Sequence, residues 1–243
     1  MVVRRSRREY RVPVSHTPVH ERIGFDETVV GFTAAEAMAE ASRCLDCHLI
    51  CSLCVGVCPN MALMTYEMDP FRTDLPILTA ANGELVAGES TPYRADQQFQ
   101  IAVLTDFCNE CGNCVTACPT SGRPYVDKPR LYLDRADFES QSANAFMMFD
   151  DGSIESRVDG ETHRMILNGT VEYTAPGFHA RLDANTLDVL EAATNGGAAD
   201  GEAYSLVAAA DMYVLLRGMA GSVGHLPTMS VAGTKIPHPG YAE

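Results

Sequence analysis

The chain has 243 residues, 46% of them hydrophobic, and a formal net charge of −14. This length allows one or two domains with a sizeable core. The acidic balance disfavours a nucleic-acid partner, because phosphate contacts need a basic surface. No apolar stretch reaches the roughly 18 residues of a membrane-spanning helix. The sequence therefore predicts a globular chain with no transmembrane segment.

Residues 1–24 predict an extended N-terminal arm, because they carry charge and prolines but little hydrophobic periodicity. The arginines at Arg4, Arg5, Arg7 and Arg8 are also typical of a twin-arginine export signal, but no apolar segment follows them. We therefore expect a cytoplasmic protein. Thiols stay reduced in that compartment, and clustered cysteines there are usually metal ligands.

A helix is predicted from Ala34 to Arg43, directly before the first cysteine of the chain, Cys44. Thr33 and Glu36 form the capping-box pattern that starts a helix. The segment between them and the cysteine lacks Gly and Pro and is rich in good helix formers.

Four of the nine cysteines follow the spacing C-x2-C-x2-C-x3-C, with Pro119 directly after the last. They are Cys108, Cys111, Cys114 and Cys118. This is the bacterial ferredoxin pattern, in which the fourth cysteine ligates the other of two clusters. Phe107 and Tyr125, near this run, are expected to shield a cluster from water or simply to pack.

The other five cysteines form an upstream run that ends in Pro59. They are Cys44, Cys47, Cys51, Cys54 and Cys58. The last four repeat the ferredoxin spacing with one residue inserted. Each iron of a [4Fe–4S] cube takes one soft thiolate, so two runs predict two cubes. Zinc is the alternative, but a zinc site rarely needs this many closely spaced cysteines.

The crossed pattern assigns each run's last cysteine to the other cluster. Cluster A then takes Cys47, Cys51, Cys54 and Cys118. Cluster B takes Cys108, Cys111, Cys114 and Cys58. Cys44 is left over, whereas a competing assignment uses Cys44, Cys47 and Cys51 and frees Cys54. We prefer the first, because the spacing from Cys51 to Pro59 matches the second run without a gap.

Between the runs, Ala62–Glu67 and Gln100–Thr105 each predict a short strand. Asn82-Gly83 predicts a turn. We expect residues 69–97 to be an insertion in the ferredoxin core, because a minimal ferredoxin has a much shorter connection.

Hairpins and helices are predicted after the second run. A strand is expected at Arg130–Leu133. Hairpins are expected at 145–149 with 153–158 and at 163–167 with 170–174. A short helix is expected at 185–194, and a longer one from Ala203 to a C-terminal cap at Gly218.

The predicted fold class is α+β. It combines a two-cluster ferredoxin-like core and an N-terminal helix with a β-rich C-terminal extension that ends in helices. The expected divisions are the arm at 1–24, the ferredoxin-like domain at 25–135 and the extension at 136–243. The extension ends in an extended tail of about twenty residues with Pro227, Pro237 and Pro239.

Three segments resemble a known family: Gly31–Cys58, with its cysteine spacing, Cys108–Cys114 and Gly122–Lys128. Over residues 25–135 the chain is similar to the iron–sulfur module of the glutamate synthase small-subunit-like oxidoreductases, and most resembles the ferredoxin module of selenate reductase-type proteins. In that family the module is joined to an FAD- and NAD(P)-binding domain. The chain shows neither a Rossmann fingerprint nor a P-loop. The resemblance therefore implies a flavoprotein partner.

The expected function is that of an electron-transfer subunit of a multisubunit oxidoreductase, not itself catalytic. It would relay electrons through two [4Fe–4S] clusters, between an FAD/NAD(P)-binding flavoprotein subunit and a catalytic oxidoreductase subunit. One alternative is a subunit that contributes part of a substrate site. A pocket with perturbed polar residues within 140–243 would favour it. The other alternative is a structural cluster-binding scaffold.

Overall fold

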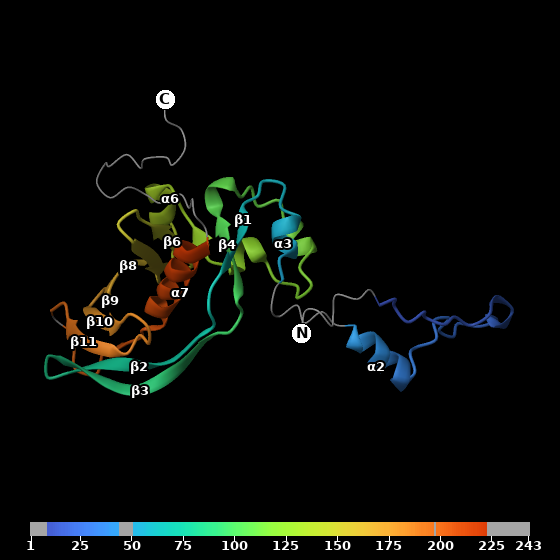
Figure 1. The fold of residues 1–243 in the computed structure, drawn as a ribbon, viewed down its shortest axis with the longest axis horizontal. Coiled ribbons are helices and arrows are strands. Elements are labelled where there is room, and N and C mark those ends of the chain that lie inside the picture. The colour runs from blue at the N-terminus through green and yellow to red at the C-terminus, as the bar shows by residue number, and fades with distance from the viewer. Residues whose placement is uncertain (1–8, 44–50, 197, 223–243) are drawn as a thin grey trace, which may run out of the picture. The chain divides into compact units, whose positions relative to one another are not determined.

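The computed structural model describes residues 9–43, 51–196 and 198–222 (Figure 1). It divides into two compact units, residues 1–49 and residues 50–243. We call them the N-terminal unit and the main unit and describe each by itself.

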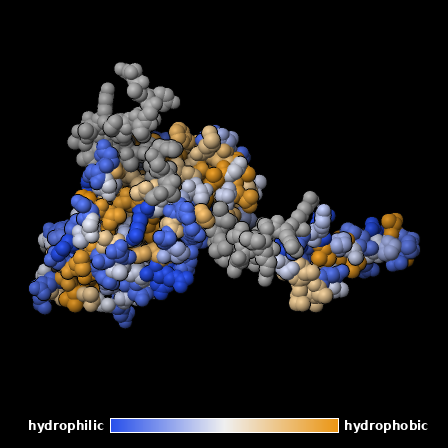
Figure 2. Space-filling view, in the orientation of Figure 1, coloured by the Kyte–Doolittle hydropathy of each residue, from blue (hydrophilic) through white to orange (hydrophobic). Residues whose placement is uncertain are grey.

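The N-terminal unit contains the predicted helix. This helix, α2 (Ala34–Ser42), begins with a complete capping box. The Glu36 N–H donates to Thr33 Oγ1 at 3.3 Å, and the Thr33 N–H donates to Glu36 Oε2 at 2.8 Å. A single turn, η1 (Val19–Glu21), precedes it. No residue of either helix is buried, so this unit has no helical core of its own. Figure 2 shows hydrophobic residues at its surface.

The main unit contains twelve described strands and six short or medium helices. The strands are β1 (Leu63–Glu67), β2 (Phe71–Ala81), β3 (Glu84–Ala95), β4 (Phe99–Leu104), β5 (Arg130–Leu131), β6 (Ala145–Met148), β7 (Ser153–Val158), β8 (Glu161–Asn168), β9 (Thr170–Ala175), β10 (Phe178–Asp183), β11 (Val189–Thr194) and β12 (Ala203–Tyr204). The helices are α3 (Leu53–Gly56), η2 (Thr105–Phe107), α4 (Asn113–Thr116), α5 (Pro124–Asp127), α6 (Arg135–Glu139) and α7 (Val207–Ser222). The α+β class is therefore confirmed.

One mixed sheet connects the cysteine-bearing part to the C-terminal part. Its strand order is β1-β4-β5-β6-β7-β8-β9-β10-β11. Strand β5 pairs in parallel with β4 and β6, and all other neighbours in this sheet are antiparallel. The strands that flank the second cysteine run, β4 and β5, thus lie next to each other.

The strands and hairpins predicted on either side of the second run are confirmed. Strands β1, β4 and β5 occupy the expected positions, and β6–β7 and β8–β9 are antiparallel hairpins. The segment at 69–97 is a long hairpin of β2 and β3 in a second sheet, with order β12-β2-β3. Its turn residues Asn82 and Gly83 both have positive φ, 53° and 83°, as the type I′ turn requires.

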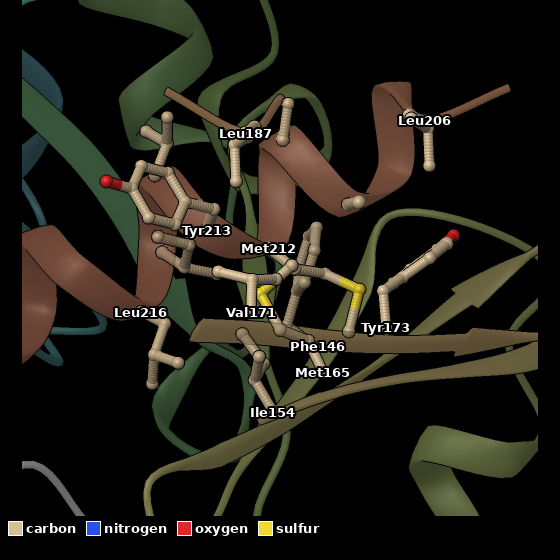
Figure 3. Packing of buried hydrophobic residues seen from close by; sticks show 14 of the residues in the cluster. Phe146, Ile154, Met165, Val171, Tyr173, Leu187, Leu206, Met212, Tyr213 and Leu216 are labelled. Carbon is tan, nitrogen blue, oxygen red and sulfur yellow. The ribbon is translucent and has the colours of Figure 1, made fainter. Parts of the chain in front are cut away.

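Helix α7 supplies much of the main core. Figure 3 shows its side chains Met212 and Leu216 beside Ile154 and Met165 of the large sheet, and Tyr213 belongs to the same cluster. All five residues are at most 5% exposed. Among the described helices, none combines the length and the apolar character that a membrane crossing requires.

The helix predicted at 185–194 is wrong. The segment begins with a turn in which the Asp183 carboxylate accepts the N–H groups of Asn185 and Thr186. It then continues as β11, which pairs with β10. Alanine, leucine and glutamate are good helix formers, but helix propensity is a weak preference, and ladder pairing with a neighbouring strand overrides it here.

The last helix is present, but both predicted ends are wrong. It begins at Val207 because Ala203–Tyr204 pairs with β2 as β12. It passes through Gly218 and ends at Ser222. A Cβ on Gly218 would lie 2.6 Å from the Tyr66 ring, so this glycine permits close packing of α7 on β1. It is not a C-terminal cap.

Gly218→Ala should therefore destabilise the main unit. The new methyl group overpacks a core in which Tyr66 is 3% exposed, at a cost of about 1–3 kcal/mol. Thermal unfolding followed by circular dichroism should show a midpoint several degrees lower. Gly88→Ala is the control, because its methyl group would come no closer than 3.5 Å to the Ile77 carbonyl oxygen. Equal midpoints for the two variants would contradict the packing role of Gly218.

Candidate iron–sulfur site

The two cysteine runs have the same backbone structure. Residues Ser52 to Ala62 correspond in order to Gly112 to Gly122. The Ser52 carbonyl accepts the N–H groups of the residues three and four positions later at 3.0 and 3.1 Å. The Gly112 carbonyl does the same at 3.0 and 3.1 Å. Each pair of bonds begins a single helical turn, α3 in the first run and α4 in the second.

Each turn carries a buried cysteine at its centre. Cys54 of α3 is 7% exposed and Cys114 of α4 is 6% exposed. Both belong to one apolar cluster, together with Leu63, Ile101 and Val103 of strands β1 and β4. The two runs therefore share a water-poor core.

The last cysteine of each run accepts a backbone hydrogen bond. The Ala62 N–H donates to Cys58 Sγ at 3.3 Å, and the Gly122 N–H donates to Cys118 Sγ at 3.2 Å. In both runs the residue before the N–H donor has a left-handed conformation, with φ 52° at Met61 and 56° at Ser121. An N–H group directed at sulfur stabilises a thiolate and tunes the potential of a bound cluster.

Four cysteines surround one hollow of the main unit. Cys108, Cys111 and Cys114 of the second run line it together with Cys58 of the first. These are the four ligands predicted for cluster B. Four soft sulfur donors from two segments fit a [4Fe–4S] cube, which takes one thiolate per iron.

Backbone conformation and one aromatic ring shape this hollow. Glu110 and Gly112 have positive φ, 55° and 80°, and turn the chain between its cysteines. Tyr125 lies in the wall of the hollow. Phe107 is not part of that wall and is 54% exposed, so the shielding expected of the two aromatics fits Tyr125 better.

Three of the four cysteines predicted for cluster A are described. Cys54 interacts electrostatically with Cys51 and with Lys128, and Cys118 also interacts with Lys128. Lys128 is thus a common cationic neighbour of Cys54 and Cys118. Cys47 and the spare Cys44 lie outside the described residues, so the choice between Cys44 and Cys54 stays a prediction. Among the described residues, no three His, Cys, Asp or Glu side chains are grouped to hold a single metal ion.

The cysteine thiols differ in acidity. Burial raises the pKa of Cys54 and of Cys108. Hydrogen bonds from Thr120, and then from the Gly122 N–H, lower the pKa of Cys118. The hydroxyl of Thr120 lies 3.3 Å from Cys118 Sγ. In protein without a cluster, Cys118 is therefore closer to the thiolate form that binds iron.

Three polar residues were not predicted from the sequence: Thr120 and Lys128 near the cysteines, and Asp211 on α7. Thr120 could have been found from its position directly after the Cys-Pro pair. Lys128 lies inside a segment that we had noted only for its resemblance. Asp211, which accepts a hydrogen bond from Tyr93 at 2.8 Å, has no sequence signal, because a polar residue on a helix face is ordinary.

The second cysteine run matches a known family. Residues 101–121 match the family model described as a 4Fe-4S binding domain, Fer4. This match supports a [4Fe–4S]-binding role for that segment.

Two curated relatives share a longer stretch. Over 111 residues the chain is 34% identical to the protein named "Putative oxidoreductase YgfK" of Escherichia coli strain K12, and equally to that of Escherichia coli O157:H7. The aligned part is 46% of this chain and 8% of each relative. The chain thus spans less than a tenth of the length of these relatives. No solved structure matches. The similarities support an iron–sulfur module of oxidoreductase type.

Alkylation should distinguish these thiols in the cluster-free protein. Iodoacetamide at neutral pH should modify Cys118 several times faster than Cys54, because only a thiolate reacts. Thr120→Val removes the hydroxyl that lowers the pKa of Cys118. The pH at which alkylation of Cys118 becomes half-maximal should then rise, as measured by mass spectrometry of digested samples.

Thr116→Val is the matched control, because its hydroxyl bonds the Gly112 carbonyl at 3.5 Å and not a cysteine. It should leave the pH profile of Cys118 unchanged. An equal shift in both variants would show that the Thr120 hydroxyl has no specific effect on this thiol.

Proposed function

We propose that the chain is an electron-transfer iron–sulfur subunit with two [4Fe–4S] clusters. It relays electrons between an NAD(P)H-linked flavoprotein and a catalytic oxidoreductase subunit. The protein supplies the thiolates, the hydrogen bonds and the apolar surroundings, and the redox chemistry belongs to the clusters.

The observation that carries the proposal is the hollow with four cysteines. Cys58 comes from a different run than Cys108, Cys111 and Cys114, yet all four line the same space. A crossed set of this kind is what the two-cluster ferredoxin pattern requires. It supports cluster B with these four ligands.

The repeated backbone supports cluster A. From Ser52 to Ala62 the first run reproduces the hydrogen bonds of the second. Its cysteines are therefore held by the same backbone structure and can act as cluster ligands in the same way. We assign Cys47, Cys51, Cys54 and Cys118 to this cluster. A buried cysteine of each proposed cluster, Cys54 for A and Cys114 for B, lies in one apolar core. The two clusters would be close neighbours with little water between them, which suits electron transfer in series.

Partner contact would involve the N-terminal unit. Its described residues expose large apolar side chains, among them Ile23 at 94% and Phe25 at 110%. Exposed apolar groups of this kind are typical of protein contact surfaces. They support a permanent complex, held by the arm at residues 1–24 and by the proline-containing C-terminal tail, which lies outside the described residues. We place this complex in the cytoplasm.

A second candidate function is a subunit that contributes part of a substrate site. A cavity of about 590 Å³ lies in the C-terminal part of the main unit, within the volume range of small-molecule sites. Two of its lining residues have perturbed acidity, because burial lowers the pKa of His163 and raises that of Asp211. A pocket with perturbed polar residues within 140–243 is what this alternative predicts.

Metal analysis and exchange of single cysteines test the two clusters. Anaerobically reconstituted protein should hold about eight iron and eight acid-labile sulfide per chain. Cys58→Ser should damage cluster B, and Cys118→Ser should damage cluster A, because each removes a ligand from the other run. Electron paramagnetic resonance of the reduced variants measures which cluster is lost.

Cys44→Ser is the matched control and should keep both clusters. Loss of a cluster in Cys44→Ser, together with its retention in Cys54→Ser, would reverse the assignment. A colourless protein that binds zinc and no iron after anaerobic reconstitution would refute the proposal.

Reduction experiments test the dependence on a flavoprotein. The isolated chain should accept electrons from dithionite but not from NADH or NADPH, since the sequence shows no nucleotide-binding loop. Adding the flavoprotein that co-purifies with it should restore reduction by the nucleotide, with little loss at high salt if the complex is permanent. Rapid loss of the clusters' visible absorption when NADH is added to the flavin-free chain would contradict the subunit role. Clusters that dithionite cannot reduce reversibly would favour a structural scaffold.

A further inference from the structure

Asp211 on α7 lines two hollows of the main unit. The first has a volume of about 590 Å³ and the second of about 480 Å³. They share the lining residues Asn144, Phe146 and Asp211. We call the two hollows together the Asp211 cleft, and each of them one half of it. Each half alone falls within the volume range of small-molecule sites in proteins.

Acidic groups outnumber basic ones in the first half of the cleft. Its lining includes the exposed acidic residues Asp159, Glu161 and Asp211 and a single guanidinium, that of Arg157. This guanidinium already donates to the carbonyls of Gln141 and Gly160 and to the hydroxyl of Thr162. It is therefore occupied by the protein itself.

The second half has the same imbalance. It adds the carboxyl groups of Asp96 and Asp127 and one guanidinium, that of Arg94. Arg94 donates to the carbonyls of Thr73 and Tyr93 at 3.0 Å. Arg94 also pairs with Asp74 at 3.4 Å, and Asp96 pairs with Arg72 at 2.5 Å. Among the described residues, Asp127 and Asp211 are therefore the carboxyl groups of this half without an ion pair. Both cations of the linings are engaged, so a phosphate or carboxylate ligand would meet net repulsion in either half.

Asp211 is positioned to accept a hydrogen bond from a ligand. The Tyr93 hydroxyl donates to its Oδ1 at 2.8 Å. Within the described residues no hydrogen bond reaches its second oxygen, Oδ2. Asp211 is an exposed residue, although desolvation by nearby groups raises the pKa of its carboxyl.

The remaining walls are apolar or neutral. Phe146, Phe178 and Ala175 are each at most 7% exposed and line the first half. His163 lies in the same wall, with Nδ1 paired to the Tyr173 hydroxyl. Burial lowers the pKa of His163, so the imidazole adds no positive charge near neutral pH.

We propose that the Asp211 cleft binds a small organic molecule with a flat apolar body and a positively charged nitrogen group, such as an amine or amidine. The apolar wall of the cleft receives the body, and Asp211 Oδ2 accepts the N–H of the charged group. The ligand carries no phosphate or carboxylate. This inference goes beyond electron relay and supplies a ligand class for the second candidate function.

The cleft also borders the segment that carries Lys128. Its second half is lined by Asp127 and Pro129, on either side of Lys128, the common neighbour of Cys54 and Cys118. A ligand in this half would lie beside the backbone on either side of Lys128. Binding itself does not require a cluster, so failure of the cleft and failure of the electron-transfer role are separate results.

Matched pairs of aromatic fragments test the inference on the full chain, reconstituted anaerobically. Tyramine and 4-hydroxyphenylacetate share a ring and differ in charge, as do benzylamine and benzoate. With about ten non-hydrogen atoms or fewer, the amines should bind with a Kd on the order of 1 mM by titration calorimetry. The carboxylates should show no binding at the same concentrations.

Two variants locate the binding. Asp211→Asn removes the charge and should weaken amine binding about tenfold. Ala208→Leu fills the first half from the half-buried face of α7 and should abolish it. Glu84→Gln is the control, because Glu84 is an exposed acid outside both linings. It should bind amines as the unmodified chain does.

Three results would overturn the proposal. The carboxylates bind as tightly as the amines, neither class binds, or Asp211→Asn binds amines with unchanged affinity. If circular dichroism shows that Ala208→Leu does not fold, the comparison of Asp211→Asn with Glu84→Gln still decides. Iron and sulfide content of the same samples reports separately on the clusters.

Discussion

The antiparallel pairing of β1 with β4 is the constraint on which the rest of the structure depends. The first cysteine run leads directly into β1, and β4 leads directly into the second run. Antiparallel pairing, with Leu63 opposite Val103, therefore brings both runs to the same end of the strand pair. Without this pairing, the fifty or so residues between the runs would leave Cys58 far from Cys108. The crossed set of thiols is thus a consequence of sheet register.

The same pairing explains why the two buried cysteines share a core. Val103 is fully buried and Leu63 is 3% exposed, so the strands bury apolar side chains against α3 and α4 while they align the runs. Burial in this core also disfavours the thiolate forms of Cys54 and Cys108 when no cluster is bound. Deprotonation of these thiols is favoured when a metal takes up their charge. Assembly of clusters and tight folding of this region are therefore expected to be linked.

Local patterns in the sequence were enough for elements that depend on neighbouring residues. The capping box at Thr33, the turn at Asn82-Gly83 and the hairpins after residue 144 each carry their own chemistry, and each is confirmed. The sequence was misleading where residues far away in the chain determine the local structure. At 185–194, pairing with β10 overrides helix propensity. At Gly218, the neighbour that requires a glycine is Tyr66, which is more than 150 residues away in the chain.

The cysteine spacing predicted the members of the four-thiol hollow, because ligand spacing is fixed by the geometry of the cube and not by the surrounding fold. The Asp211 cleft has no such signature. Its walls come from strands, loops and α7, and no two of its acidic groups recur at a spacing that predicts a site.

The large sheet gives the cleft and the cysteine runs a common framework. Strand β5 joins β4, which ends at the second run, to β6, which leads to Phe146 in the cleft wall. The Asn144 side chain donates to the carbonyls of Val126 and Lys128 at 2.7 and 2.9 Å, and Asn144 lines both halves of the cleft. A ligand that shifts Asn144 would thereby shift the backbone of Lys128. Because Lys128 is the cationic neighbour of Cys54 and Cys118, occupancy of the cleft has a direct physical route to the electrostatics of the proposed cluster A.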